Sequence, residues 1–368
     1  MNDKRLLILN MLDEGKISSQ EALELLEAIK DEKDLDNDKK QNSYQKDTRD
    51  NNAEDTESNN DSFVKKSAQA VGSILGKLNI FMDNFQDKLS EEFENVEENF
   101  TEKSDDPSPI INESYTINEI IDSKKDFIIN NPYGPINLYG HDEDNILINI
   151  NLSYKKSYEN KVNNFYKYEI SDEVFKLIFK NNISSNRENF KVGLDIRMPK
   201  NMINSLFTKS LNDDIKIHNI KVSELEVENV NSTVDLYKIS ANKINLKLLN
   251  SVYRQNNISA NDLSIKSLNS ELKIEELKTV NAKLTNPNGS ISINSIELPC
   301  KNLSLSGFNS LVNIKNLERN RPILFNNKSI NSNERINSNL NIIKDFNIDN
   351  KDILTLNINT INGKIVIC

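Results

Sequence analysis

The chain has 368 residues and a formal net charge of -10, with two His, two Cys and no Trp. Two cysteines in a chain of this length exclude a disulfide framework and favour a reducing compartment. The excess of acidic residues argues against a nucleic-acid partner. The sequence contains no run of eighteen apolar residues, so no membrane-spanning helix is predicted. The charged first residues are unlike a secretory signal.

The acidic charge is concentrated at the start of the chain. Residues 1–106 contain 14 basic and 27 acidic side chains, whereas the remainder contains 32 basic and 29 acidic ones. Composition changes at the same border, from helix-forming and polar residues to short alternating runs of Ile, Leu, Val, Asn and Ser. The sequence therefore predicts two regions of different physical kind.

Residues 1–31 are predicted to form a helical hairpin. Gly15 can end the first helix, and Ser18 with Glu21 has the spacing of a capping box that starts the second. Apolar residues recur at helical spacing and form a docking stripe of Leu6, Leu9, Ala22, Leu25, Leu26 and Ile29. A hairpin of about 30 residues buries too little apolar surface to be stable alone. We therefore expect this stripe to dock on another protein, a second copy or the rest of the chain.

Residues 32–62 are predicted to be a disordered acidic linker. The segment is nearly all Asp, Glu, Lys, Asn, Gln and Ser, which cannot offset the entropy lost on ordering. Asp34, Asp36 and Asp38 begin like a calcium loop. Lys39 stands where glycine is required and Gln45 where the bidentate glutamate belongs, so no calcium site is predicted.

Residues 63–103 are predicted to form an amphipathic helix with one apolar stripe. Lysines flank its first half and acidic residues crowd its second half. A membrane-surface or partner contact would use Phe63, Lys65, Lys66, Val71, Ile74, Lys77, Leu78, Phe81 and Phe85. The alternative is packing on the β region or, as a coiled coil, on a second copy.

The strongest feature of the sequence is an internal repeat in its C-terminal two thirds. Six comparable blocks each begin at an asparagine, and the intervals between these asparagines are 19, 19, 19, 19 and 21. These predicted corner residues are Asn212, Asn231, Asn250, Asn269, Asn288 and Asn309. A fixed period near twenty is typical of a solenoid, in which each repeat stacks on its neighbours.

Each block holds two alternating apolar runs, which predicts two short strands per coil. Side chains alternate with a period of two, so an odd repeat needs at least one corner that breaks the alternation. Asparagine suits such corners because it tolerates left-handed backbone. Residues 108–368 are therefore predicted to be a parallel β-solenoid with a structural ladder of asparagine amides inside or beside its core.

The ends of the repeat are less regular. Residues 133–139 and 146–150 resemble earlier coils, and residues 192–199 form a strand halted by Pro199. Residues 354–358 and 361–367 repeat the corner-strand unit at the terminus, while residues 327–343 are expected to form an irregular turn or cap.

Two segments carry a resemblance to a known family. The run KRLLILNMLDEGKISSQEALELL at residues 4–26 and the ending INGKIVI at 361–367 resemble YvlB/LiaX-like bacterial proteins. These join a SHOCT-like helical module to a putative-adhesin β-strand-repeat domain of unknown function. Residues 197–200 resemble the strand-ending Pro-Lys of that family, whereas most corners here have Asn-Ser in place of its Ser-Gly-Asp. The resemblance implies a Gram-positive envelope-stress role through protein or membrane contacts, without chemistry.

The residues themselves predict no enzyme and no cofactor. His141 and His218 are the only candidate imidazole bases, and neither stands in a catalytic motif. The run His141–Asp144 is an acidic loop that is interpreted as a solvated turn rather than a cation site. Phosphate-loop, dinucleotide and Cys/His metal motifs are absent from the sequence.

We expect a non-enzymatic scaffold or regulator of the envelope-stress response, located in the cytoplasm or at the inner membrane face. One alternative is a surface adhesin or envelope-peptide-binding protein that reaches the cell surface without a classical signal. Another is a self-assembling β-solenoid that polymerises through its exposed strand edges.

Overall fold

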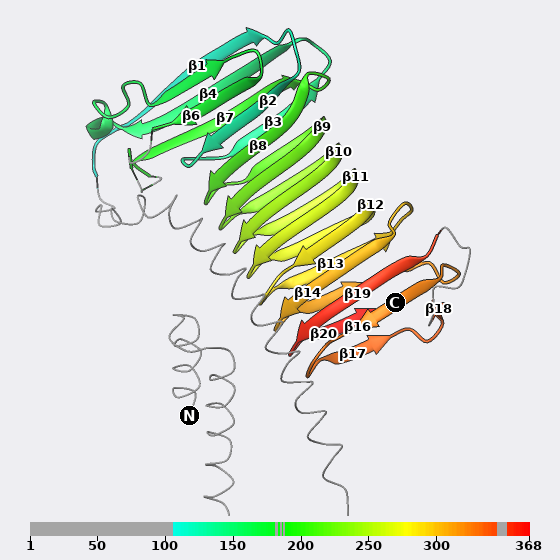
Figure 1. Cartoon of the computed structure of the whole chain (residues 1–368). Coiled ribbons are helices and arrows are strands. Elements are labelled where there is room, and N and C mark those ends of the chain that lie inside the picture. Colours follow the sequence, from blue (N-terminus) through cyan, green and yellow to red (C-terminus); the bar gives the residue numbers. More distant parts are fainter. Residues whose placement is uncertain (1–105, 181–182, 185, 187, 344–351) are drawn as a thin grey trace, which may run out of the picture. The chain divides into compact units, whose positions relative to one another are not determined.

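The structure, a computed structural model, describes residues 106–180, 183–184, 186, 188–343 and 352–368. The predicted hairpin, acidic linker and amphipathic helix, with their docking stripe and helix residues, lie outside the described residues. The described part is mainly β, as predicted, and consists of stacked strands with one 3-10 turn, η1 (Lys156–Tyr158) (Figure 1). No helix in this part is long and apolar enough to cross a membrane.

The strands vary in length from two to seventeen residues. They are β1 (Ile110–Ile120), β2 (Lys125–Asn131), β3 (Ile136–His141), β4 (Asn145–Lys155), β5 (Tyr166–Ile170), β6 (Val174–Phe179), β7 (Phe190–Pro199), β8 (Ile203–Leu211), β9 (Ile215–Val230), β10 (Thr233–Leu249), β11 (Val252–Leu268), β12 (Glu271–Thr285), β13 (Ser290–Ile296), β14 (Asn302–Phe308), β15 (Leu311–Ile314), β16 (Ile323–Asn327), β17 (Asn333–Ile336), β18 (Ile342–Ile343), β19 (Leu354–Ile361) and β20 (Lys364–Ile367).

The central strands β9–β12 pair in parallel, and each residue pairs with its equivalent in the next repeat, as the sequence predicts. Between β9 and β10 the pairing falls into three segments, which are residues 215–218, 220–222 and 224–230 of β9. Each coil therefore has three ladders where the sequence indicated two strands. The missed short ladder contains the apolar residues Ile220 and Val222, which are both buried.

The breaks between ladders explain how an odd repeat keeps one face inward. Buried positions in β9 advance by two within a ladder and by three across each break, as from Ile217 to Ile220 and from Val222 to Leu225. The first break has left-handed backbone at Asn219, Lys238 and Asn257. Without the extra residue at each break, the two-residue alternation would point the apolar side chains of the next ladder toward solvent.

The two longer ladders continue into two extended sheets. Sheet A contains, in spatial order, β1, β4, β7, β3, the first ladders of β9–β12, and then β13, β15, β20 and β17. Sheet B contains β5, β6, β2, β8, the last ladders of β9–β12, and then β14, β19, β16 and β18. Figure 1 shows β8, β9, β10, β11 and β12 stacked in chain order in the middle of the array.

The N-terminal end of the stack is antiparallel. Strand β4 pairs antiparallel with β7 and β1, and β5 pairs antiparallel with β6. Residues 146–150 therefore belong to a capping strand, and their interpretation as an early coil was wrong. By contrast, β3 at residues 136–141 pairs in parallel with β7 and β9 and is a genuine coil segment.

The C-terminal strands are not the last coil of the stack. Strands β19 and β20 lie between β14 and β16 in sheet B and between β15 and β17 in sheet A. Residues 354–358 and 361–367 repeat the corner-strand unit, as predicted, with left-handed backbone at Asn362, but this unit is inserted between earlier strands of the stack. Residues 327–343 were predicted to form an irregular turn or cap. They contribute strands β17 and β18, which form the C-terminal edges of the two sheets.

The core between the sheets also buries one of the two cysteines. Cys300 is fully buried, and the Arg321 guanidinium donates a hydrogen bond to its carbonyl oxygen, whereas Cys368 is exposed. Burial raises the pKa of the Cys300 thiol to about 11. At pH 8 this thiol stays protonated, and thiolate is the reactive form.

We therefore expect Ellman's reagent to modify one thiol in the native protein and two in denaturant. The Cys368→Ser variant serves as the control and should release no native signal. Equal reaction rates of the two thiols under native conditions would contradict the buried position of Cys300.

Candidate functional site

The six predicted corner asparagines lie on the surface at one corner of the stack. All six have left-handed backbone, with φ between 48° and 57°. Their side chains form amide hydrogen bonds between coils, from Asn231 to Asn212 (2.7 Å), Asn250 to Asn231 (2.9 Å), Asn269 to Asn250 (3.1 Å) and Asn309 to Asn288 (3.2 Å). The asparagines lie beside the core, so these contacts hold the corners rather than form a ligand site.

The serine that follows a corner asparagine bonds to the backbone of its own corner. Ser251 Oγ donates to the Leu249 carbonyl (2.8 Å), and Ser270 Oγ donates in the same way to Leu268 (2.9 Å). Both serines are buried. These two corners thus satisfy a backbone carbonyl with a side-chain hydroxyl, and the buried hydroxyl itself is hydrogen-bonded.

Asn250 lies in the middle of this ladder. Substitutions there can distinguish the contribution of the left-handed backbone from that of the amide hydrogen bonds. The Asn250→Gly variant keeps the left-handed backbone but loses two amide contacts, whereas Asn250→Ala loses both features. We expect alanine to destabilise the solenoid by about 1–2 kcal/mol more than glycine does, as measured by urea unfolding. Equal unfolding midpoints for the two variants would contradict the role of the backbone conformation.

Three ring side chains line up on the outer face of sheet A. Tyr139 of β3, His218 of β9 and Tyr237 of β10 are directly paired across neighbouring strands. The His218 ring lies 5.2 Å from Tyr139 and 5.7 Å from Tyr237, with edge contacts in both cases. We call these three residues the aromatic strip. Tyr139 and Tyr237 are 41% and 47% exposed, which is high for tyrosines on a well-packed sheet.

The residues beneath the strip hold it in place. Leu138, Ile217 and Leu236 alternate with the strip residues and point into the core, where each is at most 2% exposed. The strands that carry the rings are also paired on both sides. The rings therefore project from a rigid sheet, unlike residues on a loop.

An open pocket of about 610 Å³ adjoins the strip at Tyr139. Its lining comes from β3, β4 and β7 and consists of Tyr139, His141, Asn149, Asp195, Ile196 and Arg197. Arg197 is exposed and is the direct cross-strand neighbour of Tyr139. The pocket thus combines an aromatic face, an amide, a carboxylate and a guanidinium, which are polar and aromatic groups found in binding sites.

Two polar side chains of the pocket, Asp195 and Asn149, are held by hydrogen bonds from neighbouring strands. Asp195 accepts hydrogen bonds from Asn137 (2.9 Å) and Asn151 (3.2 Å). Ser114 of β1 donates to Asn151, and Thr116 donates to Asn149, both at 3.2 Å. We call these six residues the amide network. Because its members already bond to each other, the network presents its remaining donors and acceptors in fixed directions.

Ion pairs occur on the outer faces of both sheets. On sheet B, Lys247 contacts Glu226 (2.9 Å) and Glu228 (2.6 Å), and Lys243 contacts Glu224 (2.7 Å). On sheet A, Arg254 lies 3.7 Å from Asp235 and Lys273 lies 2.9 Å from Glu271. The side chains of Arg197 and Lys216, which flank the strip, have no ion-pair or hydrogen-bond partner in the described part of the chain. The face with the aromatic strip therefore carries two cations without a side-chain partner, together with the carboxylates of Asp195 and Asp235.

The acidic loop after His141 is held by contacts within the protein. His141 Nε2 lies 2.9 Å from the Asn145 carbonyl, and Lys200 Nζ lies 2.6 Å from Asp142 Oδ1. Among the described residues no group of three His, Cys, Asp or Glu side chains is placed to hold a metal ion. His218, the other imidazole, is half-buried on the outer face within the aromatic strip.

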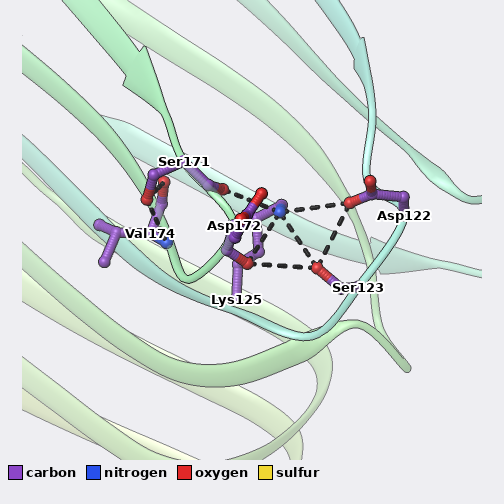
Figure 2. Close-up of polar contacts among 6 residues, drawn as sticks. All are labelled: Asp122, Ser123, Lys125, Ser171, Asp172 and Val174. Carbon is purple, nitrogen blue, oxygen red and sulfur yellow. Dashed lines mark hydrogen bonds and ion pairs between the residues drawn. The ribbon is translucent and has the colours of Figure 1, made fainter.

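A buried lysine near the N-terminal end has a structural role (Figure 2). Lys125 is only 3% exposed, and its ammonium donates to the Ser171 and Asp172 carbonyls at 2.9 and 3.0 Å and to Ser123 Oγ at 3.1 Å. Asp122 lies 3.2 Å away and is itself exposed. All the donor positions are used, so Lys125 ties the start of β2 to the β5–β6 turn and offers nothing to a ligand.

The aromatic strip and the amide network were missed by the sequence analysis. One signal was available, because His218 and Tyr237 occupy equivalent positions in successive repeats and a regular repeat aligns such residues. The remaining neighbours, Tyr139 and Arg197, join the strip only through the long-range pairing of β7, β3 and β9. No local pattern reports that pairing.

Two protein-family models match separate parts of the chain. Residues 3–34 match the SHOCT-like domain model, and residues 127–365 match the model described as Toastrack DUF4097. No curated protein matches the chain.

Several solved structures resemble the chain at low sequence identity. Two are named putative adhesins. The one from Bacteroides fragilis has 14% identity and a TM-score of 0.38, with coverage of 69% of this chain and 97% of its own. The one from Parabacteroides distasonis has 9% identity and a TM-score of 0.41, with coverage of 68% and 97%. A putative cell adhesion protein from Clostridium sporogenes has 15% identity and a TM-score of 0.24, with coverage of 69% and 99%.

The family model provides the assignment. It matches well over half of the chain and spans the solenoid from β2 to β20. The chain belongs to the Toastrack DUF4097 family.

Proposed function

We propose that the protein is a non-enzymatic binding scaffold of the bacterial cell envelope and that the outer face of sheet A is its binding face. The observation that carries this proposal is the aromatic strip, in which Tyr139, His218 and Tyr237 stand in register on the outside of a rigid sheet. Tyrosine is enriched where proteins bind partners because it offers a large apolar surface with a polar end.

The N-terminal module supports a division of labour. A SHOCT-like match followed by a Toastrack domain agrees with the resemblance to YvlB/LiaX-like proteins. On this proposal the SHOCT-like module and the Phe-rich segment 63–103 contact a protein partner or a membrane surface in envelope-stress signalling, from the cytoplasmic side. The solenoid then presents its strip to an envelope component.

The binding face is tested by sedimentation with isolated Gram-positive envelopes. The full chain should pellet with them, and the double variant Tyr139→Ser, Tyr237→Ser should bind at least about tenfold more weakly. Tyr168→Ser is the matched control, because Tyr168 is 39% exposed but belongs to β5 at the edge of sheet B. Equal binding by the double variant and the control would overturn the proposal.

The surface-adhesin alternative uses the same face on the other side of the membrane. Protease treatment of intact cells, followed by detection of the solenoid and the N-terminal module with separate antibodies, distinguishes the two. Protection of both parts is expected for the inner-face scaffold. Loss of the solenoid from intact cells would overturn the cytoplasmic location and support the adhesin.

A further inference from the structure

The amide network and the unpaired cations point to a chemical class of ligand for the proposed binding face. We propose that the pocket at Tyr139 and the aromatic strip bind a linear polysaccharide that carries carboxylate groups, such as a polyuronate. This inference rests on the proposed binding face in its surface-exposed form, the adhesin alternative, because such a polysaccharide lies outside the membrane. It names the ligand of that same face.

The aromatic and amide groups fit the sugar rings of such a chain. A sugar ring has apolar C–H faces that pack on an exposed aromatic ring, and its hydroxyls both donate and accept hydrogen bonds. Asp195 is held by two amide donors and can accept from a hydroxyl, while the Asn149 amide can donate to one. The network is fixed before any ligand binds, which lowers the entropy lost on binding.

The cations fit the carboxylates. Arg197 adjoins Tyr139 in the next strand, and its planar guanidinium matches a carboxylate in a bidentate contact. Lys216 precedes the strip residue His218 by two positions and therefore projects from the same face of β9. Asp235, which is paired with Lys216 across β9 and β10, lies 3.7 Å from Arg254, and the Asp195 carboxylate in the pocket accepts from two amides. Arg197 and Lys216 are therefore the cations on this face that a carboxylate of the ligand can contact.

The strip favours a chain of several sugars over a single sugar. Tyr139 and Tyr237 are separated by one intervening strand, which corresponds to about 9.6 Å at the usual strand spacing. Arg197 lies one strand beyond Tyr139, so the rings and the cation follow a line along the stacking direction. A polymer lying along this line would meet the guanidinium, both tyrosines and the histidine at once.

The test is calorimetric titration of the full chain with four probes. These are polygalacturonate and hyaluronate oligosaccharides, neutral dextran, and polyglutamate as an anion without sugar. We expect at least one polyuronate to bind, with weaker binding at higher salt, and dextran and polyglutamate to bind at least about tenfold more weakly. Equal binding of polyglutamate would show that charge alone acts and would overturn the proposal.

Two variants locate the binding. Arg197→Gln should weaken polyuronate binding at least about tenfold and reduce its salt dependence, and Tyr139→Ala should weaken it without changing the salt dependence. Tyr168→Ala should bind as the unchanged protein does. Absence of binding to both polyuronates, or unchanged binding by Arg197→Gln, overturns the ligand class. If envelope sedimentation still depends on Tyr139 and Tyr237 in that case, the proposed binding face stands and only the ligand assignment fails.

Discussion

A chain that ends at residue 351 is expected to lose the C-terminal coils of the solenoid while it keeps the central ones. Strands β19 and β20 are the hydrogen-bonding partners of β16 and β17, and they separate these strands from β14 and β15. Their removal also deletes the apolar side chains of Ile353, Leu354, Leu356, Ile358, Ile361, Ile365 and Ile367, all of which are buried.

The expected loss is large because these side chains act together. At about 1.5–3 kcal/mol per buried aliphatic side chain, the deletion removes on the order of 10 kcal/mol of burial, which is comparable with the stability of a whole domain. In a solenoid each coil depends chiefly on its neighbours, so the damage should stay local. Strands β9–β12 are joined by long ladders that the deletion does not touch.

Hydrogen exchange followed by mass spectrometry measures this directly. Peptides from residues 323–343 should lose their protection in the shortened chain, while peptides from residues 215–268 should keep it. The control is Asn359→Ser, which changes an outward-facing position of β19 and should leave both regions protected. Full protection of residues 323–343 in the shortened chain would contradict the insertion of β19 and β20.

The second large effect is expected from Gly134→Ala, at the corner between β2 and β3. A Cβ at this position would lie 1.9 Å from the Val192 carbonyl oxygen of β7, which is backbone and cannot rotate away. The corner is also held by Asn131 Nδ2, which donates to the Gly134 carbonyl (3.1 Å) and the Val192 carbonyl (2.8 Å). The substitution should therefore separate β3 from β7 and cost about 3 kcal/mol or more.

Gly193→Ala is the matched control for this prediction. Gly193 is the neighbour of Val192 in the same strand, but its added Cβ would meet nothing closer than the Asn151 Cβ at 3.9 Å. We expect the unfolding midpoint in urea to fall strongly for Gly134→Ala, whereas the free energy of unfolding should change by less than about 0.5 kcal/mol for Gly193→Ala. Equal midpoints for the two variants would contradict the close approach of the β2–β3 corner to β7.

The regular part of the fold could be predicted from the sequence because its information is local. Corner asparagines recur once in every repeat, and each corner needs the left-handed backbone that asparagine tolerates. The irregular part could not be predicted in this way. Residues 146–150 alternate like a coil strand, yet β4 runs antiparallel to β7, and alternation carries no information on strand direction.

The position of the C-terminal strands illustrates the same limit. Residues 354–367 look like one more coil, and the sequence places them last. Their pairing with both β14 and β16 depends on which partners compete for each edge, which is a long-range property of the whole stack.

The candidate site combines both kinds of information. The repeat aligns His218 with Tyr237, but Tyr139, Asp195 and Arg197 reach the same face through pairings between segments that are far apart in the sequence. The role of the site also depends on an unpaired guanidinium, and pairing on a sheet surface is visible only once the register is known.

The most direct test of the binding face is hydroxyl-radical footprinting of the full chain with and without isolated Gram-positive envelopes. Oxidation of Tyr139 and Tyr237 should fall when the envelopes are present, while oxidation of Tyr168, which is similarly exposed on another strand, should stay the same. Unchanged oxidation of Tyr139 and Tyr237 in an envelope-bound chain would show that the protein binds through another surface and would contradict the assignment of its function to sheet A.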